Sequence, residues 1–173
     1  DLINKNANLK KLFINIEEMF WKKEILGITD NSLNVKKNYI FIAIKGKKND
    51  GNKFIDQARS NGSKLIISSV KSGKDIIQVK NTNLRYIYSL FCASFYYNKP
   101  SQIVAVTGTN GKTSVVEFCR QIWHLAGWKS ASIGTLGTII SDDHGSRDTE
   151  TRNFTTLEPF LLHKELTELS KKN

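Results

Sequence analysis

The chain has 173 residues, a formal net charge of +10, 39% hydrophobic residues and 24% charged residues. These proportions are typical of a folded globular protein and exclude general disorder. The sequence has no run of about 18 apolar residues, so we expect no membrane insertion. At about 150 residues per domain, the length allows one domain or two small ones.

The positive charge comes mainly from lysine, because 21 of the 26 basic residues are Lys and only 5 are Arg. Asn and Ile are also abundant, at 16 and 19 residues, and all three types have codons built from A and T. Nucleic-acid readers favour Arg for bidentate contacts. We therefore expect no nucleic-acid partner and ascribe the charge to codon bias. A basic nucleic-acid-binding P-loop protein stays an alternative, and its binding would weaken steeply with salt.

Cysteine and histidine do not form a metal-binding or disulfide pattern. Cys92 and Cys119 are far apart in the sequence, and the three histidines are isolated. The sequence therefore predicts two reduced thiols in a cytoplasmic protein.

The first part of the chain is predicted to alternate helices with strands. Apolar residues at helical spacing indicate the helices, and short apolar runs such as YIFIAI indicate the strands. In chain order, the predicted elements are a helix over 8–21, a strand over 39–44, a short helix from 54 that ends at Gly62, strands over 64–68 and 76–79, and a helix over 83–97.

A break at Lys99-Pro100-Ser101 marks the predicted domain boundary, which gives domains 1–98 and 99–173. After it, we predict a strand over 102–107, a turn over 108–111, a helix over 112–125, strands over 130–135 and 137–141, a loop over 142–153 and a helix over 157–169. The alternation of strands with helices predicts an α/β protein with a largely parallel sheet.

The sequence TGTNGKTS, residues 107–114, joins a predicted strand to a predicted helix. Backbone N–H groups of such a turn point into one concavity, and the helix N-terminus adds the positive end of its dipole. Gly108 and Gly111 allow a phosphate to approach, Lys112 can reach β- and γ-phosphates, and the Thr113 hydroxyl can bind Mg²⁺. Val106 stands where the common G-x-x-x-x-G-K-[ST] pattern has Gly, so a plain strand-to-helix turn is the alternative.

This segment resembles the ATP-binding loop of the Mur ligases, the ATP-dependent amino-acid ligases of peptidoglycan synthesis. Residues 29–46, followed by Asp50-Gly51, resemble the amino-terminal uridine-nucleotide-binding domain of that family. Residues 133–137 (IGTLG) and the stretch from Thr155-Thr156 to His163 are similar to segments of the MurE-type members. The resemblance runs in order from about residue 25 to the end of the chain.

The resemblance implies a small mixed α/β domain for the UDP-linked substrate over 1–98, followed by the first part of a P-loop-type parallel-sheet ATP-binding domain over 99–173. It implies a cytoplasmic ligase, monomeric at full length, that uses ATP and Mg²⁺ to add diaminopimelate or lysine to UDP-N-acetylmuramoyl-L-alanyl-D-glutamate through an acyl phosphate. The alternatives are a MurF-type ligase and a non-catalytic fragment that binds UDP-linked substrate or ATP.

Site residues follow from the same resemblance. It assigns catalysis to Lys112 and metal binding to Thr113. The implied ATP-binding residues are Gly108, Thr109, Asn110, Gly111, Lys112, Thr113 and Ser114. The implied substrate-binding residues are Ser32, Lys47, Lys48, Asn49, Thr155 and Thr156. The plain alternatives are a turn at Ser32 and a helix cap at Thr155 and Thr156.

The chain departs from the family pattern in three residues and in length. Asn31 stands where the family usually has Asp, Leu33 where it has Arg, and Leu157 where it has Pro. Family members have three domains, and this chain reaches only into the second. We therefore expect no ligase activity from these 173 residues alone, and an incomplete sheet that exposes apolar surface.

Overall fold

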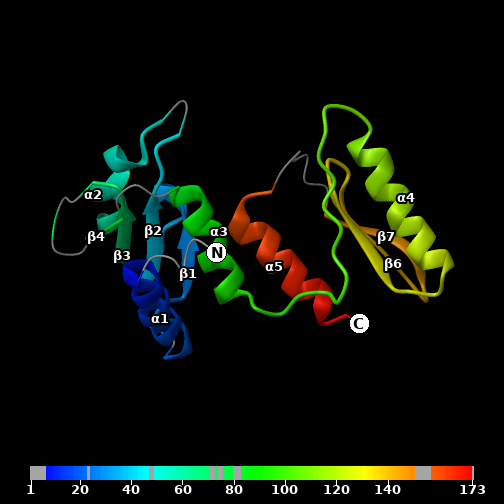
Figure 1. Cartoon of the computed structure of the whole chain (residues 1–173), viewed down its shortest axis with the longest axis horizontal. Coiled ribbons are helices and arrows are strands. Elements are labelled where there is room, and N and C mark those ends of the chain that lie inside the picture. Colours follow the sequence, from blue (N-terminus) through cyan, green and yellow to red (C-terminus); the bar gives the residue numbers. More distant parts are fainter. Residues whose placement is uncertain are drawn as a thin grey trace. The chain divides into compact units, whose positions relative to one another are not determined.

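The computed structural model describes residues 7–22, 24–46, 49–70, 73, 76–79, 83–150 and 157–172. The chain divides into two compact units, residues 1–97 and residues 98–173 (Figure 1). Within the described ranges, no helix is both long enough and apolar enough to cross a membrane.

The first unit is built on a four-stranded parallel sheet whose strands lie in sequence order. The strands are β1 (Gly27–Thr29), β2 (Tyr39–Ala43), β3 (Ser63–Ser68) and β4 (Ile76–Gln78). Phe41 of β2 lies opposite Ile66 of β3, and Ile66 lies opposite Ile76 of β4. Strand β2 reads as a continuous apolar run because both of its faces are covered, as is usual in parallel sheets.

Helices cover the two faces of this sheet. The helix α2 (Ile55–Ser60) follows a 3₁₀ turn η2 (Gly51–Phe54) and packs against β2 and β3, whereas α3 (Leu84–Phe95) packs against β1, β2 and α1 (Ala7–Trp21). Asn83 caps α3, because its side-chain oxygen accepts from the N–H groups of Arg85 and Tyr86 at 3.1 and 3.3 Å. The predicted helices and strands of this unit are confirmed.

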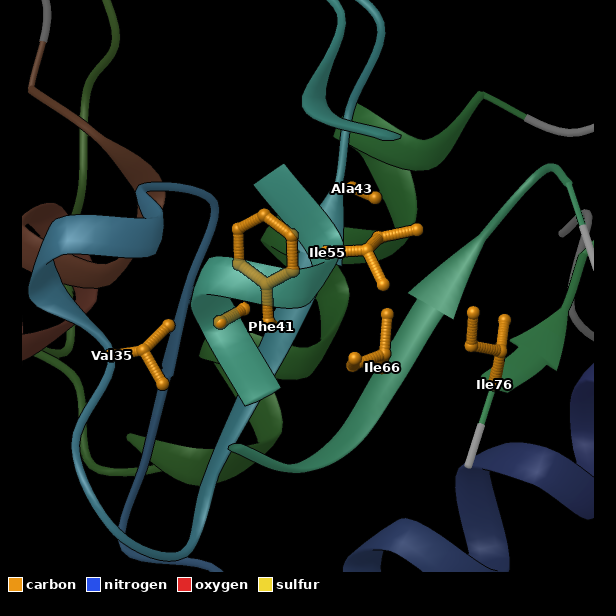
Figure 2. Close-up of a cluster of buried hydrophobic side chains, with 7 residues drawn as sticks. Val35, Phe41, Ala43, Ile55, Ile66 and Ile76 are labelled. Atoms are coloured by element: carbon orange, nitrogen blue, oxygen red, sulfur yellow. The ribbon is translucent and has the colours of Figure 1, made fainter. Parts of the chain in front are cut away.

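One apolar cluster fills the space between the sheet and α2 (Figure 2). Alternation along β2 sends Phe41 and Ala43 into it, while Ile40 and Ile42 are buried on the opposite face. The cluster consists of Val35, Phe41, Ala43, Ile55, Ala58, Ile66 and Ile76.

The turn after β2 requires glycine at position 51. Lys45 and Asp50 form an antiparallel bridge across this turn, and the carboxylate of Asp50 accepts from the Asn52 N–H at 3.0 Å. A Cβ on Gly51 would lie only 2.7 Å from the backbone N and O of Ile44. The Asp-Gly pair is therefore set by a capping bond and by close backbone approach.

The second unit contains an antiparallel sheet with strand order β5-β6-β7. Its strands are β5 (Ser130–Gly134), β6 (Gly137–Asp142) and β7 (Gly145–Glu150), and its helices are α4 (Lys112–Leu125) and α5 (Pro159–Ser170). Helix α4 packs on β5 and β6. The described sheet of this unit is thus antiparallel, and the parallel sheet of the α/β fold lies in the first unit.

Two predicted elements of the second unit are wrong. Residues 102–107 do not form a strand, because no described strand pairs with them, and Ile103 and Val104 are 52% and 56% exposed. Residues 145–150 form strand β7 rather than a loop, since Gly145 at φ 94° closes a hairpin with β6. The rest of that predicted loop, 151–153, lies outside the described residues.

The buried part of the second unit is mainly polar. Among its described residues, Ile140 has the only buried apolar side chain; the buried polar and charged residues are Arg120, Ser130, Ser132, Thr138, Ser141 and Thr167. Conversely, α4 exposes Val115, Phe118, Ile122 and Leu125, with exposed fractions from 46% to 86%. The exposed apolar surface of this unit thus includes a helix face, whereas the sequence predicted such surface for an incomplete sheet.

Candidate phosphate-binding site

The turn that leads into α4 depends on two glycines. Gly108 has φ 148° and Gly111 has φ 75°, conformations that residues with a side chain rarely adopt. A Cβ on Gly111 would meet nothing within 4 Å. The requirement at Gly111 is therefore conformational, and the space beside the turn is open.

Helix α4 begins at this turn without a side-chain cap. The N–H of Val115 donates to the carbonyl of Gly111 at 3.0 Å, so the amides of the preceding residues 112–114 have no acceptor within the helix. Free amides and the positive end of the helix dipole together form a site for an anion.

Lys112 adds a positive charge at the same place. Its ammonium donates to the carbonyl oxygens of Gly108 at 2.6 Å and Thr109 at 3.4 Å. The side chain is thus folded over the turn, while Thr109, Asn110 and Ser114 are exposed around it. This arrangement brings together all seven residues predicted to bind ATP.

The second residue of α4 contacts the hairpin beside it. The hydroxyl of Thr113 lies 3.0 Å from the hydroxyl of Thr135, in the turn between β5 and β6. The two residues line a small cavity of about 80 Å³ together with Lys112 and Glu117. One exposed hydroxyl fits Mg²⁺, which usually takes one or two protein ligands and completes its shell with water and phosphate oxygens. The described residues contain no cluster of three acidic, His or Cys side chains that could bind a metal by itself.

Further polar contacts join α4 to β5, beginning at the wall of this cavity. Glu117 accepts from the guanidinium of Arg120 at 2.8 and 3.0 Å with one carboxylate oxygen and from the Ser132 hydroxyl with the other. The Ser130 hydroxyl donates to the carbonyl of Arg120 at 2.8 Å. The charge of Glu117 is therefore balanced by Arg120 rather than left free beside the phosphate loop.

The larger hollow of this unit has a different character. It has a volume of about 450 Å³ and lies between residues 100–106, β5 and α5, with Trp123, Trp128 and the leucines of α5 on its walls. No charged side chain of the phosphate loop lines it. The hollow therefore has no part in the anion site.

In the first unit, Ser32 has a structural partner. It is 5% exposed, its hydroxyl donates to the side-chain oxygen of Gln57 at 2.6 Å, and its carbonyl accepts from Asn61 at 2.9 Å. Asn31 caps the 3₁₀ turn η1 (Ser32–Asn34) by accepting from the N–H of Leu33 at 3.0 Å. Ser32 thus links this turn to α2, and a contact with nucleotide stays a prediction.

The other predicted substrate residues are only partly described. Asn49 is exposed, and its carbonyl accepts from the Gly46 N–H at 2.8 Å. Leu33, which stands in place of the family arginine, is 72% exposed. Lys47, Lys48, Thr155 and Thr156 lie outside the described residues.

Sequence reasoning gave no role to Thr135, Glu117 or Arg120. A signal was available for Arg120, because an arginine in a chain with 21 lysines and 5 arginines points to a need for bidentate bonding. For Thr135 the signal was its place between Gly134 and Gly137, a spacing that predicts a tight hairpin turn. Nothing in the sequence placed that turn against α4.

Comparison with known proteins places these features in a family context. Residues 106–173 match the Mur ligase middle domain. A UDP-N-acetylmuramoyl-L-alanyl-D-glutamate--2,6-diaminopimelate ligase of Rickettsia rickettsii is 41% identical over 129 residues, which cover 73% of this chain and 26% of that protein. The ligase of the same name from Brucella melitensis is 38% identical over 154 residues, with 85% of this chain and 30% of that protein covered.

A solved structure of a ligase with that name superimposes with a TM-score of 0.66 at 24% identity, covering 86% of this chain and 30% of that one. At this identity the superposition concerns the fold, and it confirms the predicted α/β class. The chain spans less than a third of the length of these relatives.

Proposed function

Because the chain belongs to the Mur ligase family, we propose that it is part of an ATP-dependent ligase that adds diaminopimelate to UDP-N-acetylmuramoyl-L-alanyl-D-glutamate. The observation that carries this proposal is the glycine turn at the uncapped start of α4, with the Lys112 ammonium folded over it. The names of the curated relatives support diaminopimelate, rather than lysine, as the amino acid that is added. We also propose that the full-length enzyme is cytoplasmic and monomeric.

In the proposed reaction, the terminal carboxylate of the UDP-linked dipeptide attacks the γ-phosphate of ATP. This step forms an acyl phosphate and releases ADP, and the amino group of diaminopimelate then displaces phosphate. The amides at the start of α4 and the Lys112 ammonium hold the phosphates and offset the charge that develops on the transferred phosphoryl group. Lys112 exchanges its bonds to the loop carbonyls for bonds to phosphate oxygens.

The proposal assigns Mg²⁺ to the Thr113 hydroxyl. When bound, the ion neutralises charge on the phosphates. Thr113 contributes one oxygen ligand from the second position of a helix whose first amides face the same ligand. Its place on a rigid helix, rather than on the turn, keeps that oxygen in register with the amides.

We also propose that the first unit binds the UDP-linked substrate. Ser32 lies within residues 29–46, which resemble the family's uridine-binding domain, and Asn49 directly precedes the Asp50-Gly51 pair of the same pattern. Lys47 and Lys48 precede Asn49 in the sequence. Thr155 and Thr156 are proposed to contact the muramoyl part. For Ser32 the partly buried hydrogen bond to Gln57 supports an indirect role, in which the hydroxyl holds the turn that meets the nucleotide.

Calorimetric titration of the chain with ATP in the presence of MgCl₂ tests the proposal. Lys112→Ala removes a charge-assisted hydrogen bond to phosphate, which is worth about 1.5–3 kcal/mol, so the dissociation constant should rise at least tenfold. Lys164→Ala, at an exposed position of α5, removes the same charge elsewhere and should leave the affinity within twofold.

Equal weakening by both lysine variants would indicate nonspecific attraction to a basic protein and would contradict the proposal. A second titration with UDP-N-acetylmuramoyl-L-alanyl-D-glutamate distinguishes the ligase from other P-loop proteins, since only the ligase needs a site for this substrate.

A further inference from the structure

Thr135 occupies a fixed position beside the phosphate loop. Gly134 and Gly137 pair across the hairpin, which leaves only Thr135 and Leu136 in the turn between β5 and β6. Gly137 has φ 87°, so the turn has a backbone conformation that glycine favours. The Thr135 hydroxyl is held 3.0 Å from the hydroxyl of Thr113.

This contact is the first of three that join α4 to β5 and to the turn that follows β5. Thr113, Glu117 and Arg120 are spaced by four and three residues, so they lie on one face of the helix. They meet Thr135, Ser132 and Ser130 in turn, through a hydroxyl pair, a carboxylate and a backbone carbonyl. The contacts of Glu117 with Ser132 and of Arg120 with Ser130 are part-buried and buried, respectively. They fix the position along α4 at which Thr135 faces Thr113.

The carboxylate of Glu117, one helical turn after Thr113, is already hydrogen-bonded. One oxygen of Glu117 accepts from Ser132, and the other accepts from the Nε and Nη2 groups of Arg120. Both carboxylate oxygens of Glu117 are therefore hydrogen-bonded to Ser132 and Arg120. The hydroxyl of Thr113 contacts Thr135 instead.

The direction of the hydroxyl bond matters for a metal ligand. A hydroxyl has one hydrogen to donate and two lone pairs, and only a lone pair can face a cation. If Thr113 donates its hydrogen to Thr135, its lone pairs are free on the side of the phosphate loop. Partners of this kind orient metal ligands in proteins and raise metal affinity.

We propose that Thr135 is a positioning residue that accepts the hydrogen of the Thr113 hydroxyl and so directs a lone pair of Thr113 toward the divalent cation that accompanies the phosphates. The inference rests on the proposed function, because it requires a nucleotide–metal complex at the start of α4. In this role Thr135 acts through Thr113 and needs no contact with the nucleotide.

The test measures binding of AMP-PNP, a non-hydrolysable ATP analogue, to the 173-residue chain by calorimetry, in MgCl₂ and in EDTA. Thr135→Val keeps the shape of the side chain but removes the acceptor. Its dissociation constant in MgCl₂ should rise about three- to tenfold, the value of one hydrogen bond, and stay within twofold in EDTA. Thr135→Ser restores the hydroxyl and should match the unchanged chain in both conditions.

Two results would overturn the inference alone: Thr135→Val binding as well as the unchanged chain in MgCl₂, or binding equally weakened in MgCl₂ and EDTA, which indicates a purely structural role. If the unchanged chain binds AMP-PNP in neither condition, the proposed function itself is contradicted. Circular dichroism checks that each variant folds. If Thr135→Val does not, Thr135→Ala carries the same expectation.

Discussion

The guanidinium of Arg120 and the carboxylate of Glu117 form an ion pair, with 2.8 Å between Nη2 and Oε2 and side chains only 7% and 16% exposed. The remaining Nη1 group of Arg120 donates to the hydroxyls of Ser141 and Ser146, which also bond to each other at 2.7 Å. A charged pair thus takes the place that apolar side chains occupy in an ordinary helix–sheet interface. Such a pair is costly to break because each partner compensates the buried charge of the other.

Removal of Arg120 should therefore destabilise the second unit strongly. Arg120→Ala leaves the Glu117 carboxylate without its counter-charge and should lower the free energy of unfolding by about 3–5 kcal/mol. Urea denaturation followed by tryptophan fluorescence measures this loss, because Trp123 and Trp128 lie in the same unit. Arg147→Ala is the matched control, since the Arg147–Asp142 pair is more exposed and should contribute about 1 kcal/mol or less. Similar losses in both variants would contradict the prediction.

Gly51→Ala should destabilise the first unit. The added Cβ would lie 2.7 Å from the backbone of Ile44, and neither backbone segment can move without disturbing the end of β2. We expect a loss of about 1–3 kcal/mol, as for other overpacked sites, measured by thermal denaturation. Gly134→Ala is the control, because its Cβ would meet no atom within 4 Å. An unchanged melting temperature for Gly51→Ala would show that the turn adapts.

The Ser32–Gln57 hydrogen bond predicts energetic coupling between two segments far apart in the sequence. Ser32→Ala leaves the Gln57 side-chain oxygen without its donor and should cost about 1–3 kcal/mol of stability. Gln57→Leu should cost a similar amount, and the double variant should cost less than the sum of the two. A double-mutant cycle in urea measures the coupling. Strict additivity would mean that the bond makes no net contribution.

His163 gives the second unit a pH-dependent stability. Burial lowers the pKa of this imidazole below its usual value, and the positive charge of Lys99 lowers the same pKa further. The unfolded chain takes up a proton near pH 6.5, whereas the folded chain resists it, so acidification favours unfolding. The melting temperature should therefore fall as the pH decreases below about 6.5.

His163→Gln should flatten that part of the pH profile, because glutamine does not titrate. The comparison is made by calorimetry between pH 5.5 and 7.5. A profile of the same steepness in both proteins would assign the dependence to other groups.

Most helices and strands of the first unit could be predicted because their patterns are local. The run YIFIAI is buried on both faces, and the apolar residues of α3 recur at helical spacing, so each segment indicates its own structure. Strand β7 could not be predicted in this way. Its sequence, GSRDTE, has no apolar alternation because residues 145–148 are exposed and cover no apolar core. The strand predicted over 102–107 is wrong for the opposite reason. An apolar run becomes a strand only where a neighbouring strand pairs with its backbone hydrogen-bonding groups.

The phosphate loop could be predicted because glycine, lysine and threonine at fixed spacing carry the chemistry in consecutive residues. The position of Thr135 could not, because it depends on how a hairpin 22 residues away packs on α4. The interior role of Arg120 was hidden for a similar reason. An amphipathic pattern predicts that charged residues face solvent, whereas α4 turns its charged face to the sheet and its apolar face outward.

The strand-free segment over 102–107 also bears on how the protein behaves at high concentration. Residues 102–106 read QIVAV, an uncharged stretch of high β-propensity without proline, and Ile103 and Val104 are exposed within it. Segments of this kind form intermolecular strands in aggregates, whereas the charged residues Arg147 and Asp148 protect the edge strand β7 from such pairing. Aggregation of the chain should therefore begin at 102–106, and a single lysine introduced at Val104 should delay it without touching the phosphate loop.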